Sequence, residues 1–404
     1  MSIARDAGTA AVGRGRAGKV LLVVNVDWFF WSHRLPIARG LARAGYEVVV
    51  ATGSEGGDYA ARIEAEGFRF ARLSMRRGWG SPLAEWWAFR ELLALYRRER
   101  PDVVHHVTIK PVLYGTLAAR LAGVPRIVVA LSGLGYAAGG CGRLARARQG
   151  TLLLACRLAF ASPRVWAIFQ NQHDLGRFVA RGVLAPQRAV LIRGSGVDLH
   201  RFRPLPEPPG PPVIVFASRL LWDKGLGELV AACAQLQREG RRFRLVIAGR
   251  VDRENPRGIP EDRLRGWQSE GLCEWRGLVE DVPALLAEAS VVALPSYYRE
   301  GVPKILLEAG AAGRPIVASD EPGCLEIARE GENAVVVPSR DAAALAAALA
   351  RLLDDPSLRE RLGRRGREIA EREFGEDRVV AETLALYAAV GERAGPEEGC
   401  GVAA

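Results

Sequence analysis

The sequence predicts an α/β protein made of two doubly wound domains that face each other across a cleft. Short apolar runs alternate with longer helical patterns through most of the 404 residues, which is typical of parallel sheets covered by helices on both faces. The alternation stops once, at residues 194–212, where six prolines exclude a regular element. It then restarts, so we expect two domains joined by this linker.

The first half contains apolar runs of strand length. These runs are Lys19–Val24, Glu47–Ala51, Val103–His106, Arg126–Ala130 and Val165–Phe169. Helical patterns lie between them at about 35–44, 84–99, 112–122 and 143–160. We expect one domain over 19–193, preceded by a disordered lead at 1–18 that lacks the apolar core of a signal peptide.

The second half repeats the alternation. Its expected strands are Val213–Ala217, Arg244–Ala248, Cys273–Trp275, Val291–Leu294 and Pro315–Ala318. Its helical patterns lie at Leu226–Glu239, Val282–Ala289, Pro303–Ala312, Ala342–Asp354 and Pro356–Phe374. We expect a domain over 213–375, a helix within 376–393 that packs back on the first domain, and a loose tail at 394–404. Ligands of such sheets bind beyond the carboxyl ends of the strands.

Charge is divided unevenly between the halves. Residues 1–193 carry 28 Arg and Lys against 12 Asp and Glu, whereas residues 194–404 carry 28 against 34. A basic half favours an anionic surface or ligand, although a coding preference for arginine also explains the count, since only four of the 56 cations are lysine. No apolar run reaches the roughly 20 residues of a membrane span. The six cysteines form no CxxC pair, which argues against a zinc site or a disulfide framework and fits a reducing cytosol.

Two glutamates, Glu300 and Glu308, enclose an expected helix start. Pro303 suits the first helical position because its missing N–H costs nothing there. The helix start offers unpaired N–H groups and the positive end of its dipole, which suit a phosphate. The two carboxylates beside the helix start can accept hydrogen bonds from sugar hydroxyls. The segment from Glu300 to Glu308 is therefore typical of a nucleotide-sugar site. An amphipathic helix with a solvated glutamate at each end is the alternative.

Two cations follow the first strand of the second half. Arg219 and Lys224 lie at the turn between that strand and the next helix. Such a pair can neutralise a pyrophosphate without a metal, and an ordinary solvated turn is the alternative. The P-loop pattern GxxxxGK[ST] is absent from the sequence.

The loop after the first strand carries aromatic and basic side chains, among them Trp28, His33 and Arg34. We consider this strand-to-helix loop a candidate acceptor site, and a hydrophobic staple on a helix start is the alternative. The loop has no GxGxxG, which argues against NAD binding.

Two histidines end the strand that begins at Val103. Because side chains alternate along a strand, only one of His105 and His106 can face the cleft. We treat His105 as a catalytic candidate, and His106 and Lys110 as candidates for acceptor binding. A buried histidine with satisfied ring nitrogens is the alternative.

Two segments mix basic and apolar residues. Arg143–Trp166 contains five arginines beside several leucines, and Trp79, Trp86 and Trp87 lie among arginines within 76–90. This composition suits docking on an anionic membrane surface. Core-facing helices with a solvated basic face are the alternative.

Taken in order over residues 19–390, these segments resemble a retaining glycosyltransferase of family 4 with the GT-B fold, in which two Rossmann-like domains face each other. In the second half the resemblance rests on the following segments: Glu300–Glu308, GRPIVASDEPGCLEI at 313–327, the pair Arg219 and Lys224, and the linker motif GSGVDLHRF at 194–202. In the first half it rests on FWSHRLP at 30–36, TIKPVLYG at 108–115, LSGLGY at 131–136 and FQN at 169–171. This half is similar to the bacterial capsule, O-antigen and lipid-linked oligosaccharide branch.

The chain departs from the family pattern at two places. Many members have a glycine-rich first loop, where this chain has Val26–Phe29. Many also have a histidine two residues beyond His105, where this chain has Val107.

The resemblance implies transfer of a hexose or N-acetylhexosamine from a UDP-sugar to a polyprenyl-diphosphate-linked glycan, with no metal and no cofactor. It places the protein in the cytoplasm, peripherally on the anionic inner face of the cell membrane, and it implies no nucleic-acid partner. Glu300 would contact the donor-sugar hydroxyls and Glu308 the ribose, beside the backbone of Gly301, Val302, Pro303 and Lys304. Arg219 and Lys224 would stabilise the departing diphosphate. That phosphate could deprotonate the acceptor on the same face, while domain closure excludes water.

Two other functions stay open. A nucleotide-sugar epimerase would need its own acid and base residues in the cleft and would turn over the donor alone. A non-catalytic protein that binds sugar nucleotides or scaffolds a membrane would be expected to lack Glu300, Glu308, Arg219 or Lys224, and all four are present.

Overall fold

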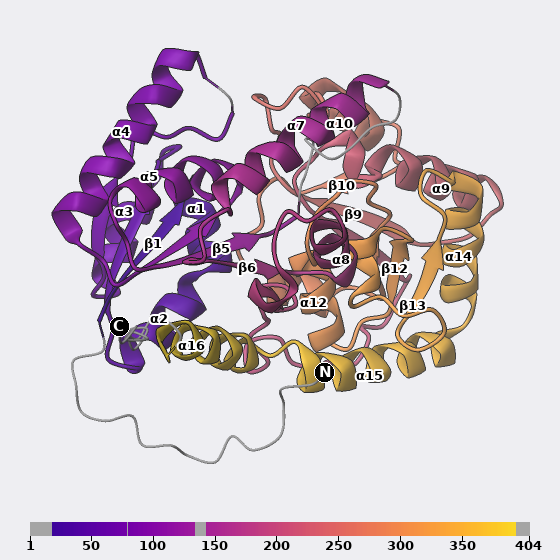
Figure 1. Cartoon of the computed structure of the whole chain (residues 1–404). Coiled ribbons are helices and arrows are strands. Elements are labelled where there is room, and N and C mark those ends of the chain that lie inside the picture. The colour runs from indigo at the N-terminus through magenta and orange to yellow at the C-terminus, as the bar shows by residue number, and fades with distance from the viewer. Residues whose placement is uncertain (1–17, 79, 134–142, 393–404) are drawn as a thin grey trace, which may run out of the picture.

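The computed structural model describes residues 18–78, 80–133 and 143–392. Over these residues the chain forms two parallel sheets packed against helices (Figure 1). The predicted α/β class with two doubly wound domains is confirmed. Residues 1–17, the tail at 394–404, Trp79 and the end of the 131–136 motif lie outside the described residues.

The sheet of the first domain has the strand order β3-β2-β1-β4-β5-β6-β7, and its strands are parallel. Its strands are β1 (Lys19–Val24), β2 (Glu47–Thr52), β3 (Arg69–Arg72), β4 (Val103–Val107), β5 (Arg126–Leu131), β6 (Val165–Phe169) and β7 (Ala189–Leu191). Along β1, Leu21 and Val23 join one apolar core while Leu22 and Val24 join another. Both faces of this sheet are therefore buried, which explains why its central strands are continuous apolar runs.

Helices cover both faces of the first sheet. One face is covered by α4 (Pro82–Glu99), α5 (Thr116–Leu121), α7 (Arg143–Ala159) and α8 (Gln172–Ala180). The other face is covered by α1 (Asp27–His33), α2 (Leu35–Arg43), α3 (Tyr59–Ala65) and α16 (Glu376–Glu392). No helix in the described ranges is both long enough and apolar enough to cross a membrane.

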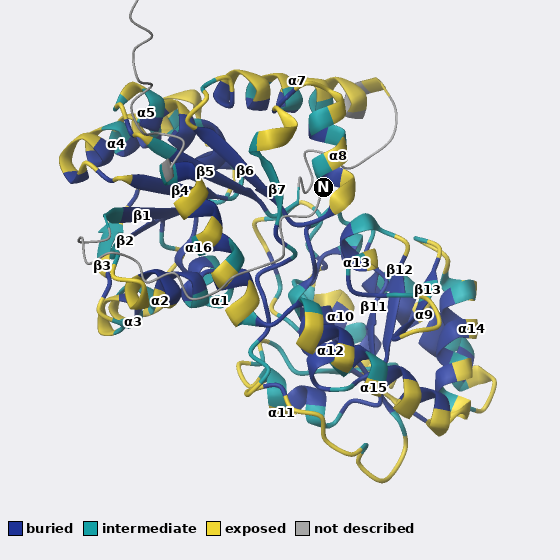
Figure 2. Cartoon of the chain, turned by 60° about the horizontal axis from the view of Figure 1, so that its bottom comes forward, coloured by how far each residue is buried: buried dark blue, intermediate teal, exposed yellow. Residues whose placement is uncertain are grey.

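The sheet of the second domain has the strand order β10-β9-β8-β11-β12-β13, also parallel. Its strands are β8 (Val213–Ala217), β9 (Arg244–Ala248), β10 (Glu274–Trp275), β11 (Val291–Leu294), β12 (Ile316–Ser319) and β13 (Ala334–Val337). Its helices are α9 (Leu226–Arg238), α10 (Glu261–Ser269), α11 (Val282–Ala287), α12 (Lys304–Ala311), α13 (Pro322–Leu325), α14 (Ala342–Asp354) and α15 (Pro356–Glu373). Figure 2 shows the buried strands at the centre and the exposed residues on the outer helix faces.

The chain crosses between the domains at two neighbouring places. The linker is irregular, but Val197 N donates to Phe374 O at 2.9 Å and Glu376 N donates to Val197 O at 3.1 Å. From there α16 runs onto the first domain, where it packs against α2 and adds Tyr387 to the core. The linker and the start of α16 thus lie side by side and form a two-chain connection.

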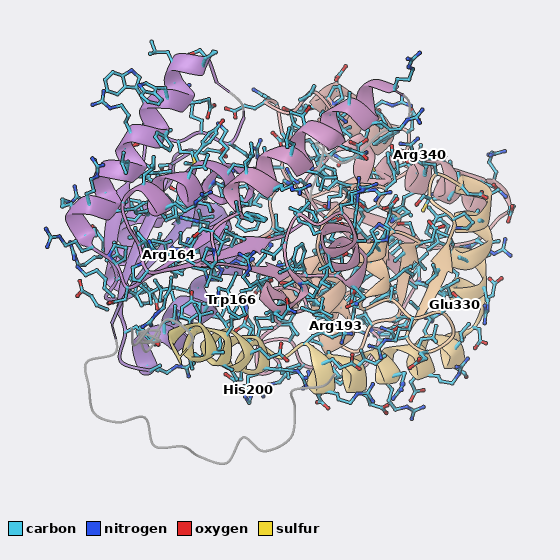
Figure 3. The ribbon with its side chains drawn as sticks, in the orientation of Figure 1. Arg164, Trp166, Arg193, His200, Glu330 and Arg340 are labelled. Carbon is cyan, nitrogen blue, oxygen red and sulfur yellow. The ribbon has the colours of Figure 1, made fainter. Side chains whose placement is uncertain are left out.

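A further contact joins the domains near the end of the first one. Arg193 Nε donates to Glu326 Oε2 at 2.8 Å, and Gln172 N donates to Glu326 Oε1 at 2.8 Å. Figure 3 shows Arg193 at the middle of the molecule, between the two sheets. Glu326 therefore ties the second domain to α8 of the first.

The structure contains elements that periodicity did not reveal. The edge strands β3 and β7 are only partly buried, so their sequences lack the apolar run of a central strand. The segment Asp27–His33, which we expected to be a loop, forms α1. Asp27 occupies its first turn, with Oδ1 accepting the Trp28 N–H at 2.9 Å, and Phe30 fills the core beneath it.

Candidate functional site

The strand order of each sheet reverses at one point, between β1 and β4 in the first domain and between β8 and β11 in the second. Loops at such a point leave the carboxyl edge of the sheet in opposite directions and open a crevice for ligands. Arg219 and Lys224 follow β8, and Glu300 follows β11. The topology therefore brings these three side chains to one edge of the second sheet.

Lys224 and Glu300 form a direct ion pair, with Nζ 2.5 Å from Oε1. The Lys224 side chain is only 4% exposed, whereas that of Glu300 is 19% exposed. Ser296 Oγ donates to the same oxygen of Glu300 at 3.1 Å, and the Tyr298 ring centre lies 5.2 Å from Lys224 Nζ. Both contacts made by Glu300 use Oε1, so within the described part of the chain its Oε2 atom can still accept from a hydroxyl donor.

Arg219 is held less tightly than Lys224. Its guanidinium carbon lies 5.5 Å from the centre of the Tyr298 ring, and Nη1 lies 3.9 Å from Asp252 Oδ2. About a third of the Arg219 side chain is exposed. A guanidinium in this state can form a bidentate contact with a phosphate.

The start of α12 lies where the two domains touch. We expected Pro303 at the first helical position. It lies instead at the N-cap, one residue before α12 begins at Lys304. Gly301 N donates to Ser132 O of the first domain at 3.1 Å. A Cβ atom on Gly301 would lie 1.9 Å from Gln170 Oε1, so a larger residue here would require the Gln170 side chain of the first domain to move. Val302 is buried beside it.

Glu308 and Lys304 lie one turn apart on α12. Burial raises the pKa of Glu308 to about 7, although the nearby charges of Lys304 and Arg201 act in the opposite direction. Lys304 Nζ lies 3.9 Å from Glu308 Oε1 and donates to Ser32 O of the first domain at 2.5 Å. Lys304 thus links the helix of one domain to α1 of the other.

His33 and Arg34 end α1 on the opposite side of this junction. The pKa of His33 is well below its usual value because of burial and because Lys304, Arg34 and Arg219 are cationic, so its ring is neutral near pH 7. Arg34 is buried, and Nη2 donates to Ser132 Oγ at 3.0 Å. Burial lowers the pKa of Arg34 to about 10. Predicted donor and acceptor residues from both domains therefore meet here.

Trp28 lies on the same helix. Its Nε1 donates to Glu55 Oε2 at 3.0 Å, and the guanidinium of Arg250 from the second domain lies 5.8 Å from the ring centre. The indole is partly exposed. Trp28 thus stands at the boundary between the domains, as an acceptor contact would require.

His105 and His106 point to opposite faces of the first sheet. His105 Nδ1 hydrogen-bonds Tyr387 OH of α16 at 2.7 Å, whereas His106 Nε2 hydrogen-bonds Tyr96 OH of α4 at 2.9 Å. Both side chains are at most 1% exposed, and burial lowers both pKa values, that of His106 to about 3. The predicted alternation is observed, and both rings are buried because β4 is a central strand with helices over both faces. Their catalytic and acceptor roles stay predictions.

Lys110 also makes internal contacts. Its side chain is 3% exposed, and Nζ lies 2.7 Å from Glu85 Oε1 and 2.5 Å from Gly78 O. The ammonium therefore braces the loop that precedes α4. Its acceptor role stays a prediction.

Sequence reasoning missed several residues that shape this site. Asp223 Oδ1 accepts hydrogen bonds from Arg257 at 2.9 and 2.7 Å, which fixes the turn that carries Lys224. Ser296 and Tyr298 follow β11 directly, and that position at a strand end was the signal that could have found them.

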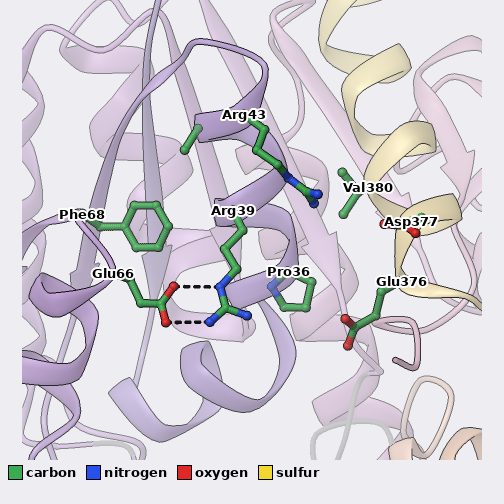
Figure 4. A pocket seen from close by; sticks show the side chains of 9 residues that line it. Pro36, Arg39, Arg43, Glu66, Phe68, Glu376, Asp377 and Val380 are labelled. Carbon is green, nitrogen blue, oxygen red and sulfur yellow. Dashed lines mark hydrogen bonds and ion pairs between the residues drawn. The ribbon is translucent and has the colours of Figure 1, made fainter. Parts of the chain in front are cut away.

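A surface hollow of about 400 Å³ lies elsewhere, between α2 and α16 (Figure 4). Its lining consists of Pro36, Arg39, Ala42, Arg43, Glu66, Phe68, Glu376, Asp377 and Val380. Arg39 and Glu66 neutralise each other there through two hydrogen bonds of 2.7 and 2.6 Å. The hollow is built from helix surfaces and the turn before β3 and not from the carboxyl ends of strands, so we do not assign it to the substrate site.

In the described part of the chain, no group of three or more His, Cys, Asp or Glu side chains could hold a metal ion. Metal independence stays a prediction.

Two family models match the chain, one on each domain. Residues 200–369 match the family described as Glycosyl transferases group 1, and residues 19–160 match Glycosyl transferase 4-like. The chain belongs to these glycosyltransferase families. The resemblance inferred from the motifs is thereby confirmed.

Relatives extend the match over nearly the whole length. The chain is 29% identical over 389 residues to the putative glycosyltransferase EpsD of Bacillus subtilis, covering 92% of this chain and 96% of that protein. It is 25% identical over 370 residues to N,N'-diacetylbacillosaminyl-diphospho-undecaprenol alpha-1,3-N-acetylgalactosaminyltransferase of Campylobacter jejuni, covering 88% of this chain and 95% of that enzyme. Both alignments span the two domains and the linker.

Solved structures show the same fold. Sucrose-phosphate synthase of Thermosynechococcus elongatus matches with a TM-score of 0.76 at 20% identity, covering 93% of this chain and 99% of that one. HepE of Anabaena in complex with UDP and glucose matches with a TM-score of 0.73 at 17% identity, covering 92% and 99%. The glycosyltransferase therefore has the GT-B architecture.

Proposed function

We propose that this glycosyltransferase moves a hexose or N-acetylhexosamine from a nucleotide diphosphate sugar, specifically a UDP-sugar, to a lipid-linked or polysaccharide acceptor. The observation that carries the proposal is the pair Lys224–Glu300 at the carboxyl edge of the second sheet, with Arg219 beside it. The UDP and glucose in HepE support the donor class. The name of the Campylobacter jejuni relative, which includes a diphospho-undecaprenol, supports the acceptor class and a role in bacterial glycan synthesis.

Each part of the donor has a counterpart in this arrangement. Arg219 and Lys224 supply positive charge for the diphosphate. Glu300 is proposed to offer a carboxylate oxygen to the sugar hydroxyls, and Glu308 on α12 is proposed to bind the ribose. The N–H groups at the start of α12 add partial positive charge on the phosphate side.

The transfer needs no base from the enzyme. The bond between C1 of the sugar and the diphosphate oxygen breaks, and the acceptor oxygen bonds to C1 on the same face. The acceptor proton passes to the departing diphosphate, whose growing negative charge Arg219 and Lys224 stabilise. The anomeric configuration is thereby retained, and no metal takes part in the proposed step.

The acceptor is proposed to enter along the first domain. Trp28, His33 and Arg34 stand at the domain junction. The surface of α4, α5 and α7 carries exposed apolar side chains, which are Leu83, Trp86, Trp87, Leu117, Leu121, Leu154 and Leu158. With its arginines this surface suits peripheral binding to the anionic inner face of the cell membrane, where a lipid-linked acceptor resides.

The direct test is a donor screen. The purified full-length protein is incubated with UDP- and GDP-sugars, with and without a polyprenyl-diphosphate sugar, and release of nucleoside diphosphate is measured. Release that requires one donor and the lipid acceptor is the expected result. Turnover of the donor alone to an isomer would show an epimerase, and binding without turnover would show a different acceptor or a binding protein. Repeating the active pair with EDTA tests metal independence, and loss of activity in the chelator would contradict it.

A further inference from the structure

Arg77 and Asp252 form an ion pair across the two domains, next to Arg219. Arg77 lies in the loop between β3 and α4 of the first domain, and its Nη2 donates to Asp252 Oδ1. Asp252 lies in the loop between β9 and α10 of the second domain, and its side chain is only 6% exposed. Neither residue belongs to the donor or acceptor residues described above.

The second oxygen of Asp252 is the one nearer to Arg219. Oδ2 lies 3.9 Å from Arg219 Nη1, and this buried oxygen has no hydrogen-bond donor among the described residues. A separation of 3.9 Å is too long for a hydrogen bond, but the charges still attract each other. The two oxygens of the Asp252 carboxylate therefore have different partners. Arg77 hydrogen-bonds Oδ1, whereas Arg219 lies just outside hydrogen-bonding distance of Oδ2.

Asp252 and Arg219 belong to one rigid unit of the second domain. An isolated bridge pairs Leu220 with Val251, which are the chain neighbours of Arg219 and Asp252. The distance between this carboxylate and this guanidinium is thus governed by side-chain rotation and not by domain motion. Arg77, in contrast, belongs to the first domain, so its distance from Asp252 depends on the relative position of the two domains.

Arg77 has a second acid on its own domain. Its Nε lies 3.7 Å from Glu55 Oε1, and Glu55 Oε2 accepts the hydrogen bond from Trp28 Nε1. When the domains separate, Arg77 keeps Glu55 as a partner. Asp252 then retains Arg219 as the cation within 4 Å among the described residues.

We propose that Arg77 sets the affinity of Arg219 for the donor diphosphate by acting through Asp252. With the domains apart, the Asp252 carboxylate turns to Arg219 and competes with an anionic ligand. With the domains closed, Arg77 takes the carboxylate and leaves Arg219 to the diphosphate. Arg77 is thus a positioning residue for a donor site on the other domain. This inference rests on the proposed function, because it requires Arg219 to bind a nucleoside diphosphate.

The test is a set of binding titrations with UDP and GDP on the full-length protein at constant ionic strength. Arg77→Met is expected to weaken nucleoside diphosphate binding by about tenfold, a size typical of coupling between sites. Asp252→Asn removes the competing charge and is expected not to weaken binding. The double variant Arg77→Met/Asp252→Asn is expected to regain most of the affinity that Arg77→Met loses. An ion pair that only holds the domains together predicts the opposite, with all three variants equally weak.

Controls separate this inference from the proposed function. Arg253→Met removes a neighbouring guanidinium that is 80% exposed and pairs with Glu261 within the second domain, and it should leave binding unchanged. In steady-state assays Arg77→Met should raise KM for the donor and leave kcat within about twofold, which general destabilisation would not do. Arg77→Met with wild-type affinity, or a double variant without recovery, would overturn the inference alone. A wild-type protein that binds neither nucleotide would overturn the proposed function as well.

Discussion

The two sides of the cleft use polar residues differently. In the second domain, Glu300 and Arg219 stand on short loops at strand ends, with polar atoms still accessible. In the first domain, His105 Nδ1, His106 Nε2 and Lys110 Nζ are buried and hydrogen-bond Tyr387, Tyr96 and Glu85, and His105 Nε2 is buried with no hydrogen-bond partner among the described residues. A polar side chain near a strand end is therefore available to a ligand only where no helix or loop of the same domain covers it.

Glu300 gives the largest expected effect on the donor side. Glu300→Gln removes the charge that faces Lys224 and that, in the proposed function, also binds the sugar hydroxyls. We expect kcat to fall by at least about 100-fold, as for loss of a charged group at a reacting centre. Lys224 keeps Tyr298 nearby, so the fold should survive. Steady-state kinetics and circular dichroism on the same preparation measure both.

A matched control lies on the surface of the same domain. Glu332 is about half exposed and pairs with Arg365. Glu332→Gln carries the same chemical change and should leave kcat unaltered. Wild-type turnover in Glu300→Gln would show that Glu300 is not part of the site. The accessible carboxylate of the second domain would then matter no more for turnover than the buried polar residues of the first.

Donor binding is expected to depend on pH through Glu308. In the proposed function the ribose hydroxyls donate to the Glu308 carboxylate, so the ionised form would bind the donor, and burial raises the pKa of Glu308 to about 7. From about pH 8 to about pH 6 the ionised fraction, and with it donor affinity, should fall by roughly tenfold. Calorimetric titration at several pH values measures this. Glu308→Gln should give a flatter profile, and an equally steep one would assign the pH dependence to another group.

The same residue predicts a trend in stability. The folded pKa of Glu308 is raised from 4.5 to about 7, so the folded state holds this proton more tightly than the unfolded state. The stabilisation is complete below the unfolded pKa and is lost as pH rises through the folded pKa, by up to about 3 kcal/mol. Relative to the wild type, Glu308→Gln should gain stability as pH rises from about 4.5 to about 7, and the difference should level off above that. Urea unfolding at low and high pH measures the difference, and a constant difference would contradict the raised pKa.

The buried histidines offer a paired test of the first domain. Tyr387→Phe and Tyr96→Phe each remove one hydroxyl that hydrogen-bonds a histidine of β4. If both histidines serve the fold, each change should cost about 1 kcal/mol of unfolding free energy and change kcat by less than about threefold. A much larger loss of kcat in Tyr387→Phe alone would instead give His105 a part in catalysis. Denaturant unfolding and kinetics on both variants decide between these outcomes.

The fold was predictable from sequence where strands are central. Lys19–Val24, Val165–Phe169 and Val213–Ala217 match β1, β6 and β8 residue for residue, because a strand buried on both faces is a continuous apolar run. The edge strands β3 and β7 are only partly buried and carry no such signal.

The site was predictable only as separate local motifs. Lys224 and Glu300 were each found from their own loop, but their contact depends on β8 and β11 lying side by side. The cover over His105 comes from α16 near the other end of the chain, and the partner of Arg77 comes from the other domain. Local periodicity predicts that His105 and His106 alternate, but it carries no information on which distant helices cover them.

The smallest expected effect concerns the outer surfaces of the domains. Of the ten large hydrophobic side chains exposed in the described residues, seven lie on α4, α5 and α7 of the first domain. Trp86→Ala/Trp87→Ala should weaken sedimentation with anionic vesicles by a few-fold, because each indole buries apolar area at the interface. Leu278→Ala, which removes an exposed side chain of the second domain, should have no effect. Binding should also fall as salt rises. Equal losses in both variants, or binding that is insensitive to salt, would mean that the domains do not differ in their affinity for a membrane.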